Sequence, residues 1–172
     1  MPLLVLTIVL VLMLAELWLS RSNERALRAQ GASEPPGDVY PTMAWAYPAS
    51  FLAMAAEGVI VGPSPTALFV VGITLFIAAK AIKYWAIASL GSRWTFRVLV
   101  PARAHLVTRG PYAWLRHPNY VGVIGELIGV ALIVCAPVTG LAATVGFARL
   151  LRHRIAIENR ALGRDQPLQK GV

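Results

Sequence analysis

The sequence is poor in charged residues and in cysteine. Only 14% of its 172 residues are charged, whereas a soluble globular domain usually carries about 25%. A soluble domain of ordinary composition is therefore excluded. The single cysteine, Cys135, lies in an apolar segment. No intrachain disulfide is possible, and the sequence gives no indication of the redox compartment.

Acidic residues are also scarce. Eight acids stand against 16 lysines and arginines, which gives a formal net charge of +8. Nucleic-acid binding would require basic residues along a water-facing helix face or groove. Here the basic residues lie between apolar segments, so we expect no nucleic-acid partner. We expect no metal site either.

Apolar segments fill most of the chain. Hydrophobic residues make up 57% of it and the mean hydropathy is +0.63. A run of about 20 apolar residues can cross a bilayer as a helix. The pattern predicts an all-α integral membrane protein, a single domain over residues 1–172 with about five transmembrane helices. The expected helices cover residues 3–19, 43–62, 66–88, 119–135 and 138–160.

The first apolar run has an alternative interpretation as a cleaved signal peptide. Such a peptide needs basic residues before the run and a small-residue cleavage site after it. Nothing basic precedes residue 3, and the polar segment SRSNER follows residue 19. The run is therefore interpreted as a retained transmembrane helix.

The placement of basic residues predicts the orientation. Cytoplasmic loops of membrane proteins are enriched in lysine and arginine. Fourteen of the sixteen basic residues lie between the first and second expected helices, between the third and fourth, or from residue 149 onward, and the loops near Pro63 and Pro137 carry no charge. The expected topology has the N-terminus outside and the C-terminus in the cytoplasm, and the expected location is a bacterial inner membrane.

The long segment between the third and fourth helices is the first candidate site. It ends in RHPNY, residues 116–120. Pro118 suits the first turn of a helix, where its missing N–H costs nothing. The free amides of that turn could bind a ligand carboxylate. Alternatively, His117 is an ordinary surface histidine and Arg116 an anchor at the membrane interface.

The fourth expected helix carries three glycines. Gly125 and Gly129 form a GxxxG pair, which indicates close packing against another helix. Gly122 lies nearer His117, so we expect a ligand to approach there. Ionisable residues within apolar helices usually face a cavity or the bundle interior. The roles of three such acids stay open at this point: Glu16, Glu57 and Glu126.

A second polar motif lies near the C-terminus, where residues 152–162 read RHRIAIENRAL. Arg154 and Glu158 are four residues apart and share one helix face. By spacing alone, this pattern is typical of an exposed ion pair that stabilises a helix by a few tenths of a kcal/mol.

Taken together, LVTRGPYAWLRHPNYVG and, about forty residues later, RIAIENRAL resemble the isoprenylcysteine carboxyl methyltransferase family. The resemblance covers residues 89–162. Shorter segments, NERALRAQGASE and YPTM, resemble bacterial members that O-methylate alkylpyrones made by type III polyketide synthases. The resemblance implies the cofactor S-adenosylmethionine, in a cytoplasmic site formed by the loop between helices three and four and the C-terminal helix.

The resemblance also implies roles for individual residues. Arg154 would face the acceptor oxygen, and Arg154 and Glu158 are the candidate catalytic residues. Two departures stand out: Glu158-Asn159 replaces the family's usual pair of acids, and an aromatic-rich FGxxY segment is missing after Leu162. The second departure argues against a large protein substrate. The implied cofactor contacts are Leu106, Val107, Tyr112, His117, Pro118, Asn119, Tyr120 and Glu158.

The sequence therefore predicts an S-adenosylmethionine-dependent O-methyltransferase. Its partner would be a lipophilic acidic small molecule from the bilayer, such as an alkylpyrone hydroxyl. Alternatives are carboxyl methylation of an isoprenylcysteine, an NADPH-dependent membrane reductase of the sterol-reductase type, and a non-catalytic membrane protein. A small transporter is disfavoured because the charges gather at one face and not at the bilayer midplane. The oligomeric state stays open.

Overall fold

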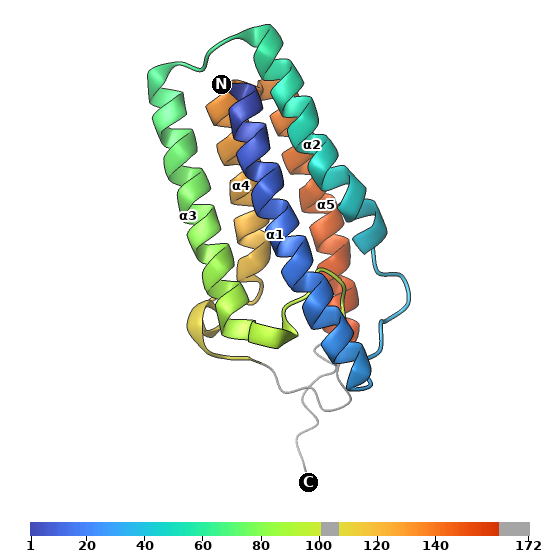
Figure 1. The fold of residues 1–172 in the computed structure, drawn as a ribbon. Helices are drawn as coiled ribbons and strands as arrows, with labels where there is room; N and C mark the ends of the chain where they lie inside the picture. Colours follow the sequence, from blue (N-terminus) through green and yellow to red (C-terminus); the bar gives the residue numbers. More distant parts are fainter. Residues whose placement is uncertain (101–106, 162–172) are drawn as a thin grey trace.

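The computed structural model describes residues 1–100 and 107–161. Five α-helices run up and down in one bundle, and two short 3-10 helices connect α3 to α4 (Figure 1). The predicted all-α class is confirmed. The helices are α1 (Pro2–Ala29), α2 (Tyr40–Val61), α3 (Thr66–Leu90), η1 (Gly91–Arg93), η2 (Gly110–Ala113), α4 (Pro118–Val134) and α5 (Pro137–Ala161).

The bounds of α1 differ most from the expected ones. α1 continues to Ala29, ten residues beyond the end of its apolar run. Seven of the ten additional residues are arginine, alanine, leucine or glutamate, which all favour helix. The change from apolar to polar residues therefore marks where the helix leaves the apolar layer, not where it ends. The other four helices begin and end within three residues of the expected positions.

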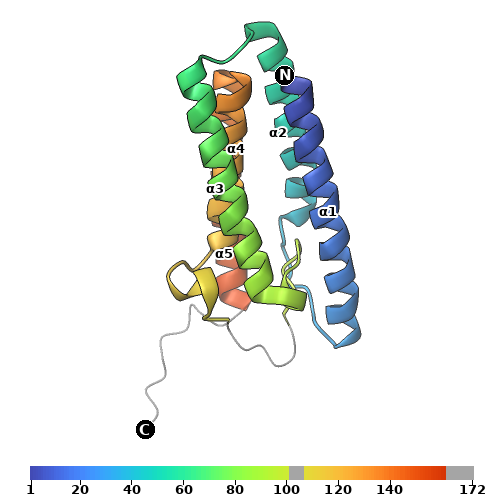
Figure 2. The same ribbon diagram turned by 60° about the vertical axis from the view of Figure 1, so that its left-hand side comes forward.

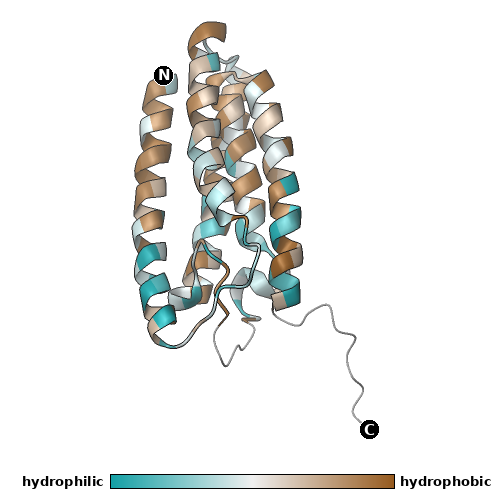
Figure 3. Ribbon diagram, turned by 90° about the vertical axis from the view of Figure 1, so that its right-hand side faces the viewer, coloured by the Kyte–Doolittle hydropathy of each residue, from teal (hydrophilic) through white to brown (hydrophobic). Residues whose placement is uncertain are grey.

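The chain is an integral membrane protein. Three helical stretches are long and apolar enough to cross a membrane: α1, α2, and α3 together with η1. α4 is apolar but has only 17 residues, and α5 gathers its arginines in its second half. Hydrophilic residues concentrate at one end of the bundle (Figure 3), which we call the polar end. Met1 and the α2–α3 loop lie at the opposite, apolar end (Figure 1).

α3 and α4 form the tightest helix pair, and glycine is the reason. A Cβ atom at Gly125 would lie 2.7 Å from the Ala79 Cβ, and one at Gly129 would lie 2.9 Å from the Phe76 backbone nitrogen. Neither position has room for a side chain, so the predicted packing role of the GxxxG pair is confirmed. Gly122 also faces α3, where a Cβ would meet the Lys83 Cβ at 2.9 Å. The expectation that a ligand approaches Gly122 is therefore wrong.

One of the three membrane acids has a structural role. Glu57, near the end of α2, accepts hydrogen bonds from the backbone N–H groups of Val138 and Thr139, at 3.0 and 2.7 Å. These are unpaired N–H groups of the first turn of α5, and a carboxylate there also interacts favourably with the helix dipole. Glu57 thus caps α5.

The apolar core fills the part of the bundle away from the polar end. There α2, α4 and α5 bring together residues such as Phe51, Met54, Leu127, Val130 and Phe147. Nearer the polar end, α1 and α2 stand on one side of the bundle and α3 and α4 on the other (Figure 2).

Candidate functional site

A cavity of about 980 Å³ lies between these two sides of the bundle. Its walls are chemically divided. Apolar side chains of α1 and α2, among them Leu10, Met13, Met43 and Pro48, line one part. The part toward the polar end is lined by charged and hydrogen-bonding groups: Tyr112, His117, Asn119, Tyr120, Arg154 and Glu158. The cavity therefore suits a ligand set that is polar at one end and apolar at the other.

The Tyr120 hydroxyl is the centre of the polar part. It donates a hydrogen bond to Glu158 Oε2 at 2.9 Å and accepts one from Arg154 Nε, also at 2.9 Å. Arg154 and Glu158 lie one turn apart on α5, so both can reach the same group. The exposed ion pair that their spacing alone suggested is thus replaced by a network that meets at Tyr120.

His117 belongs to the same network. It is the N-cap residue of α4, and its Nδ1 lies 3.6 Å from Glu158 Oε2. Its ring stacks on the Tyr120 ring, with a centroid distance of 5.3 Å and an interplanar angle of 9°. Pro118 is buried in the first turn of α4 and does not line the cavity. The turn that Pro118 begins sets the position of His117, Asn119 and Tyr120.

Arg154 is buried and held at each of its three nitrogens. Besides Nε, its Nη1 lies 3.1 Å from Asp38 Oδ1, and its Nη2 donates to the carbonyl of Phe96. Asp38 in turn accepts hydrogen bonds from the backbone N–H groups of Tyr40 and Val98, at 3.1 and 3.0 Å. The planar guanidinium is thereby fixed in one orientation beside the cavity.

Asp38 was not identified from the sequence. It lies two residues before the observed start of α2 but five residues before the expected start at residue 43. Its main partner, Arg154, is 116 positions away in the chain.

The extended segment from Trp94 to Val98 closes one wall of the cavity. Its backbone is attached to α1: Phe96 N–H donates to the Ser20 hydroxyl at 2.8 Å, and Asn23 donates to the Trp94 carbonyl at 2.8 Å. Arg97 pairs with Glu34 at 2.7 Å. Burial opposes ionisation of Glu34, but hydrogen bonds from Arg28 and Arg97 outweigh it and lower the pKa of that carboxyl. This wall is thus tied to α1 and to the α1–α2 loop.

Most of the predicted cofactor contacts lie on this one cavity. Val107, Tyr112, His117, Asn119, Tyr120 and Glu158 all line it, while Leu106 lies outside the described residues. Burial, assisted by the nearby Glu158 carboxylate, raises the pKa of Tyr112, so its phenol stays neutral. The Asn119 Oδ1 atom is buried and has no hydrogen-bond partner among the described residues. An unpaired buried acceptor of this kind calls for a donor on a ligand.

Comparison with known proteins places the chain among methyltransferases. The family profile named isoprenylcysteine carboxyl methyltransferase (ICMT) matches residues 70–164. The uncharacterized protein YpbQ of Bacillus subtilis is 33% identical over 159 residues, which cover 92% of this chain and 95% of that protein.

Two eukaryotic relatives match over a shorter region. Protein-S-isoprenylcysteine O-methyltransferase B of Arabidopsis thaliana is 30% identical over 53% of this chain and 47% of its own length. The human Protein-S-isoprenylcysteine O-methyltransferase is 32% identical over 56% of this chain and 35% of its own length. The chain therefore spans less than half of these two relatives.

Proposed function

The chain belongs to the isoprenylcysteine carboxyl methyltransferase family and is a membrane methyltransferase, and from this premise we propose that it methylates an acidic hydroxyl of a lipophilic molecule with S-adenosylmethionine. One observation carries the proposal. A single cavity joins a polar network around Tyr120 to an apolar wall on α1 and α2. A polar methyl donor and an apolar acceptor can thus meet within one cavity.

The residues present fit the cofactor. S-adenosylmethionine supplies a methyl group made electrophilic by its sulfonium. Its ammonium and hydroxyl groups are donors, which suit the Glu158 carboxylate and the unpaired Asn119 Oδ1. Its carboxylate suits the start of α4, where the helix dipole favours an anion. His117, Tyr120, Tyr112 and Val107 would complete the contacts, together with Leu106 and with Pro118, which shapes the turn.

Arg154 would hold the acceptor oxygen. A guanidinium stays protonated at any physiological pH and cannot remove a proton. It can only stabilise an oxygen that is already anionic, which is the state of an acidic enol or a carboxylate near neutral pH. Arg154 is fixed by Asp38, Tyr120 and the Phe96 carbonyl. Such preorganisation aligns the acceptor for an in-line displacement, in which positioning supplies several kcal/mol.

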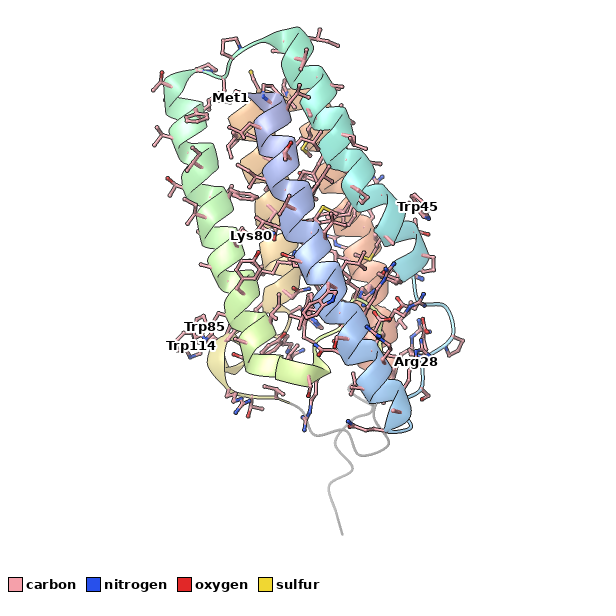
Figure 4. The ribbon with its side chains drawn as sticks, in the orientation of Figure 1. Met1, Arg28, Trp45, Lys80, Trp85 and Trp114 are labelled. Atoms are coloured by element: carbon pink, nitrogen blue, oxygen red, sulfur yellow. The ribbon has the colours of Figure 1, made fainter. Side chains whose placement is uncertain are left out.

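The apolar tail of the acceptor would lie between α1 and α2. Leu14 and Trp45 line the cavity there and are also 64% and 80% exposed on the outer surface. In Figure 4, Trp45 extends from α2 away from the bundle. In a membrane these exposed side chains would contact lipid, so the tail could arrive laterally without crossing water.

An alkylpyrone is our first candidate acceptor. It is favoured by the resemblance of residues 23–34 and 40–43 to bacterial pyrone methylating members and by the missing FGxxY segment. Carboxyl methylation of an isoprenylcysteine is the second candidate, and the names of the eukaryotic relatives favour it.

A methylation assay in lipid nanodiscs tests both acceptors. We expect radiolabelled methyl transfer to a long-chain 4-hydroxy-2-pyrone, with inhibition by S-adenosylhomocysteine, and little transfer to N-acetyl-S-farnesylcysteine. Transfer to the farnesylcysteine alone would overturn the acceptor assignment. Absence of any S-adenosylhomocysteine binding would overturn the cofactor assignment, and tight NADPH binding would favour a reductase.

The proposed orientation places the polar end in the cytoplasm of a bacterial cell and the N-terminus outside. We expect an impermeant thiol reagent added from outside to label Ser64→Cys, in the α2–α3 loop, and to miss Arg103→Cys. Both variants are made in a Cys135→Ala background. Equal labelling at both positions in intact cells would contradict this orientation.

A further inference from the structure

Four charged side chains are buried together in the interior of the bundle. They are Glu16 of α1, Lys80 and Lys83 of α3, and Glu126 of α4, and none is more than 8% exposed. Lys80 Nζ lies 2.9 Å from Glu16 and 3.0 Å from Glu126. Lys83 Nζ lies 2.6 Å from Glu16 and 3.1 Å from Glu126. We call these four residues the ionic tetrad.

Stability does not explain the tetrad. Removing charges from water carries a large desolvation cost, and replacing a buried ion pair with apolar residues of similar volume is often neutral or stabilising. Ionisable residues at membrane depth typically mark functional sites instead. In Figure 4, Lys80 lies above Trp85 on α3, toward the apolar end of the bundle.

The two lysines have different surroundings. Lys83 and Glu16 line the cavity, together with Tyr47, whose hydroxyl donates to Glu126 at 2.9 Å. Lys80 is not part of the cavity wall, and its ammonium lies over the Phe76 and Tyr84 rings at 5.8 and 5.5 Å. The tetrad therefore presents one of its two cations to the cavity.

Close packing fixes Lys83 in this place. The missing side chain of Gly122 makes room for the stem of Lys83, since a Cβ there would lie 2.9 Å from the Lys83 Cβ. Gly122 is one turn along α4 from Pro118. Tyr120, which contacts Arg154, and Glu126, which contacts Lys83, are six residues apart, or about 9 Å along the helix axis. Arg154 and Lys83 thus line the same cavity at two different depths along α4.

We propose that Lys83 is a specificity-determining residue that binds a second oxygen of the acceptor's head group while Arg154 holds the oxygen that is methylated. This inference rests on the proposed function. Lys83 Nζ forms ion pairs with Glu16 Oε2 and Glu126 Oε1, but neither oxygen accepts a hydrogen bond among the described residues, so the N–H groups of the ammonium can serve the ligand. The tetrad keeps the cation at a depth where it could not persist alone.

Two separated cations select a chemical class of acceptor. A carboxylate carries both oxygens on one carbon, so a single guanidinium can bind both of them. A cyclic enolate such as a hydroxypyrone shares its charge between oxygens on different ring carbons. The pair of Arg154 and Lys83 thus favours a cyclic enolate with an alkyl tail over a prenylcysteine carboxylate.

A matched pair of double variants tests the inference. Lys83→Met/Glu126→Gln and Lys80→Met/Glu126→Gln each remove one positive and one negative charge from the tetrad. They differ in which lysine remains. The probes are a long-chain 4-hydroxy-2-pyrone and its neutral O-methyl ether, with binding measured in nanodiscs saturated with S-adenosylhomocysteine. Thermal unfolding and S-adenosylhomocysteine affinity verify that both variants are folded.

We expect the wild type to bind the pyrone more tightly than the ether. Loss of Lys83 should weaken pyrone binding by about tenfold or more and raise KM more than it lowers kcat, whereas loss of Lys80 should change binding by less than about threefold. Affinity for the ether and for S-adenosylhomocysteine should change little in either variant. Equal losses in both variants, or none, would overturn the inference.

The relative affinity of the wild type for the pyrone and the ether is a further test of the role of Lys83. If it shows no preference for the pyrone over the ether, the proposed role of Lys83 is wrong even when a variant does not fold. Pyrone binding that depends on Lys83 but is not followed by methyl transfer would refute the proposed function and leave the recognition role standing.

Discussion

Two buried polar networks share the cavity, and they are built differently. The network around Arg154 takes its partners from helix ends and connecting segments, such as Asp38 and the Phe96 carbonyl, and it includes hydrogen bonds to backbone groups. The ionic tetrad takes all four members from helix interiors, and each lysine contacts both acids. The first network orients a single guanidinium beside a ligand, whereas the second neutralises charges that are buried in the interior of the bundle.

The largest effect on stability is expected when one charge of the ionic tetrad is removed without its counter-charge. Lys80→Met leaves two carboxylates with one ammonium, and breaking a buried ion pair on one side typically costs about 3–5 kcal/mol. We expect a strong loss of thermal stability in detergent. Lys80→Met/Glu126→Gln should recover most of it because the remaining charges balance. A single variant as stable as the wild type would show that the tetrad is hydrated.

Arg154→Lys should spare stability and reduce turnover. Lysine keeps the charge but loses the planar group that contacts Asp38, Tyr120 and the Phe96 carbonyl together. The expected loss of methyl transfer is about a hundredfold, or about 2.7 kcal/mol. Affinity for S-adenosylhomocysteine should change much less. Arg152→Lys, at an exposed position on the same helix, is the control. Full activity in Arg154→Ala would remove Arg154 from the reaction.

His117→Ala and Glu158→Ala should act on the cofactor side of the same network. Each removes a group that lines the polar part of the cavity. We expect S-adenosylhomocysteine to bind about tenfold more weakly or worse, at least about 1.4 kcal/mol, by calorimetry on purified protein. His153→Ala, an exposed histidine on α5, should bind normally. Unchanged affinity in both site variants would place the cofactor elsewhere.

The smallest expected effect on stability concerns Glu34, which pairs with Arg97 in the wall of the cavity. The pKa of Glu34 is lowered from its usual 4.5, so its bonds with Arg28 and Arg97 stabilise the fold above that pH and are lost as the pH falls below it. Glu34→Gln cannot titrate. We expect the wild type to be slightly more stable than Glu34→Gln at neutral pH, with the difference shrinking under acid conditions. A difference in thermal stability that is independent of pH would exclude this linkage.

The same comparison shows what the sequence could predict. The apolar runs predicted the five helices because a helix that crosses a bilayer needs a long run of apolar residues. The two motifs predicted which side chains gather on the cavity. That prediction came from the family resemblance of the two motifs; by spacing alone, Arg154 and Glu158 were expected to form an exposed ion pair. Partners far apart in the chain were not predicted. No local pattern marked Asp38 as a partner of Arg154, or Lys80 and Lys83 as partners of Glu16 and Glu126, because the sequence does not show which acid faces which base.

The tetrad also has a consequence for biosynthesis. Glu16 lies 64 residues before Lys80 in the chain, so the ribosome releases the carboxylate well before either cation exists. The first helix must therefore enter the membrane with an unpaired acid, at a cost of about 2.5–3.5 kcal/mol on insertion scales if the acid is placed centrally. Its most apolar window of 18 residues has a mean hydropathy of 2.5, above the values of the other two candidate spans, and this offsets the cost. The candidate span with the most apolar window is thus the one that must carry an uncompensated charge during assembly.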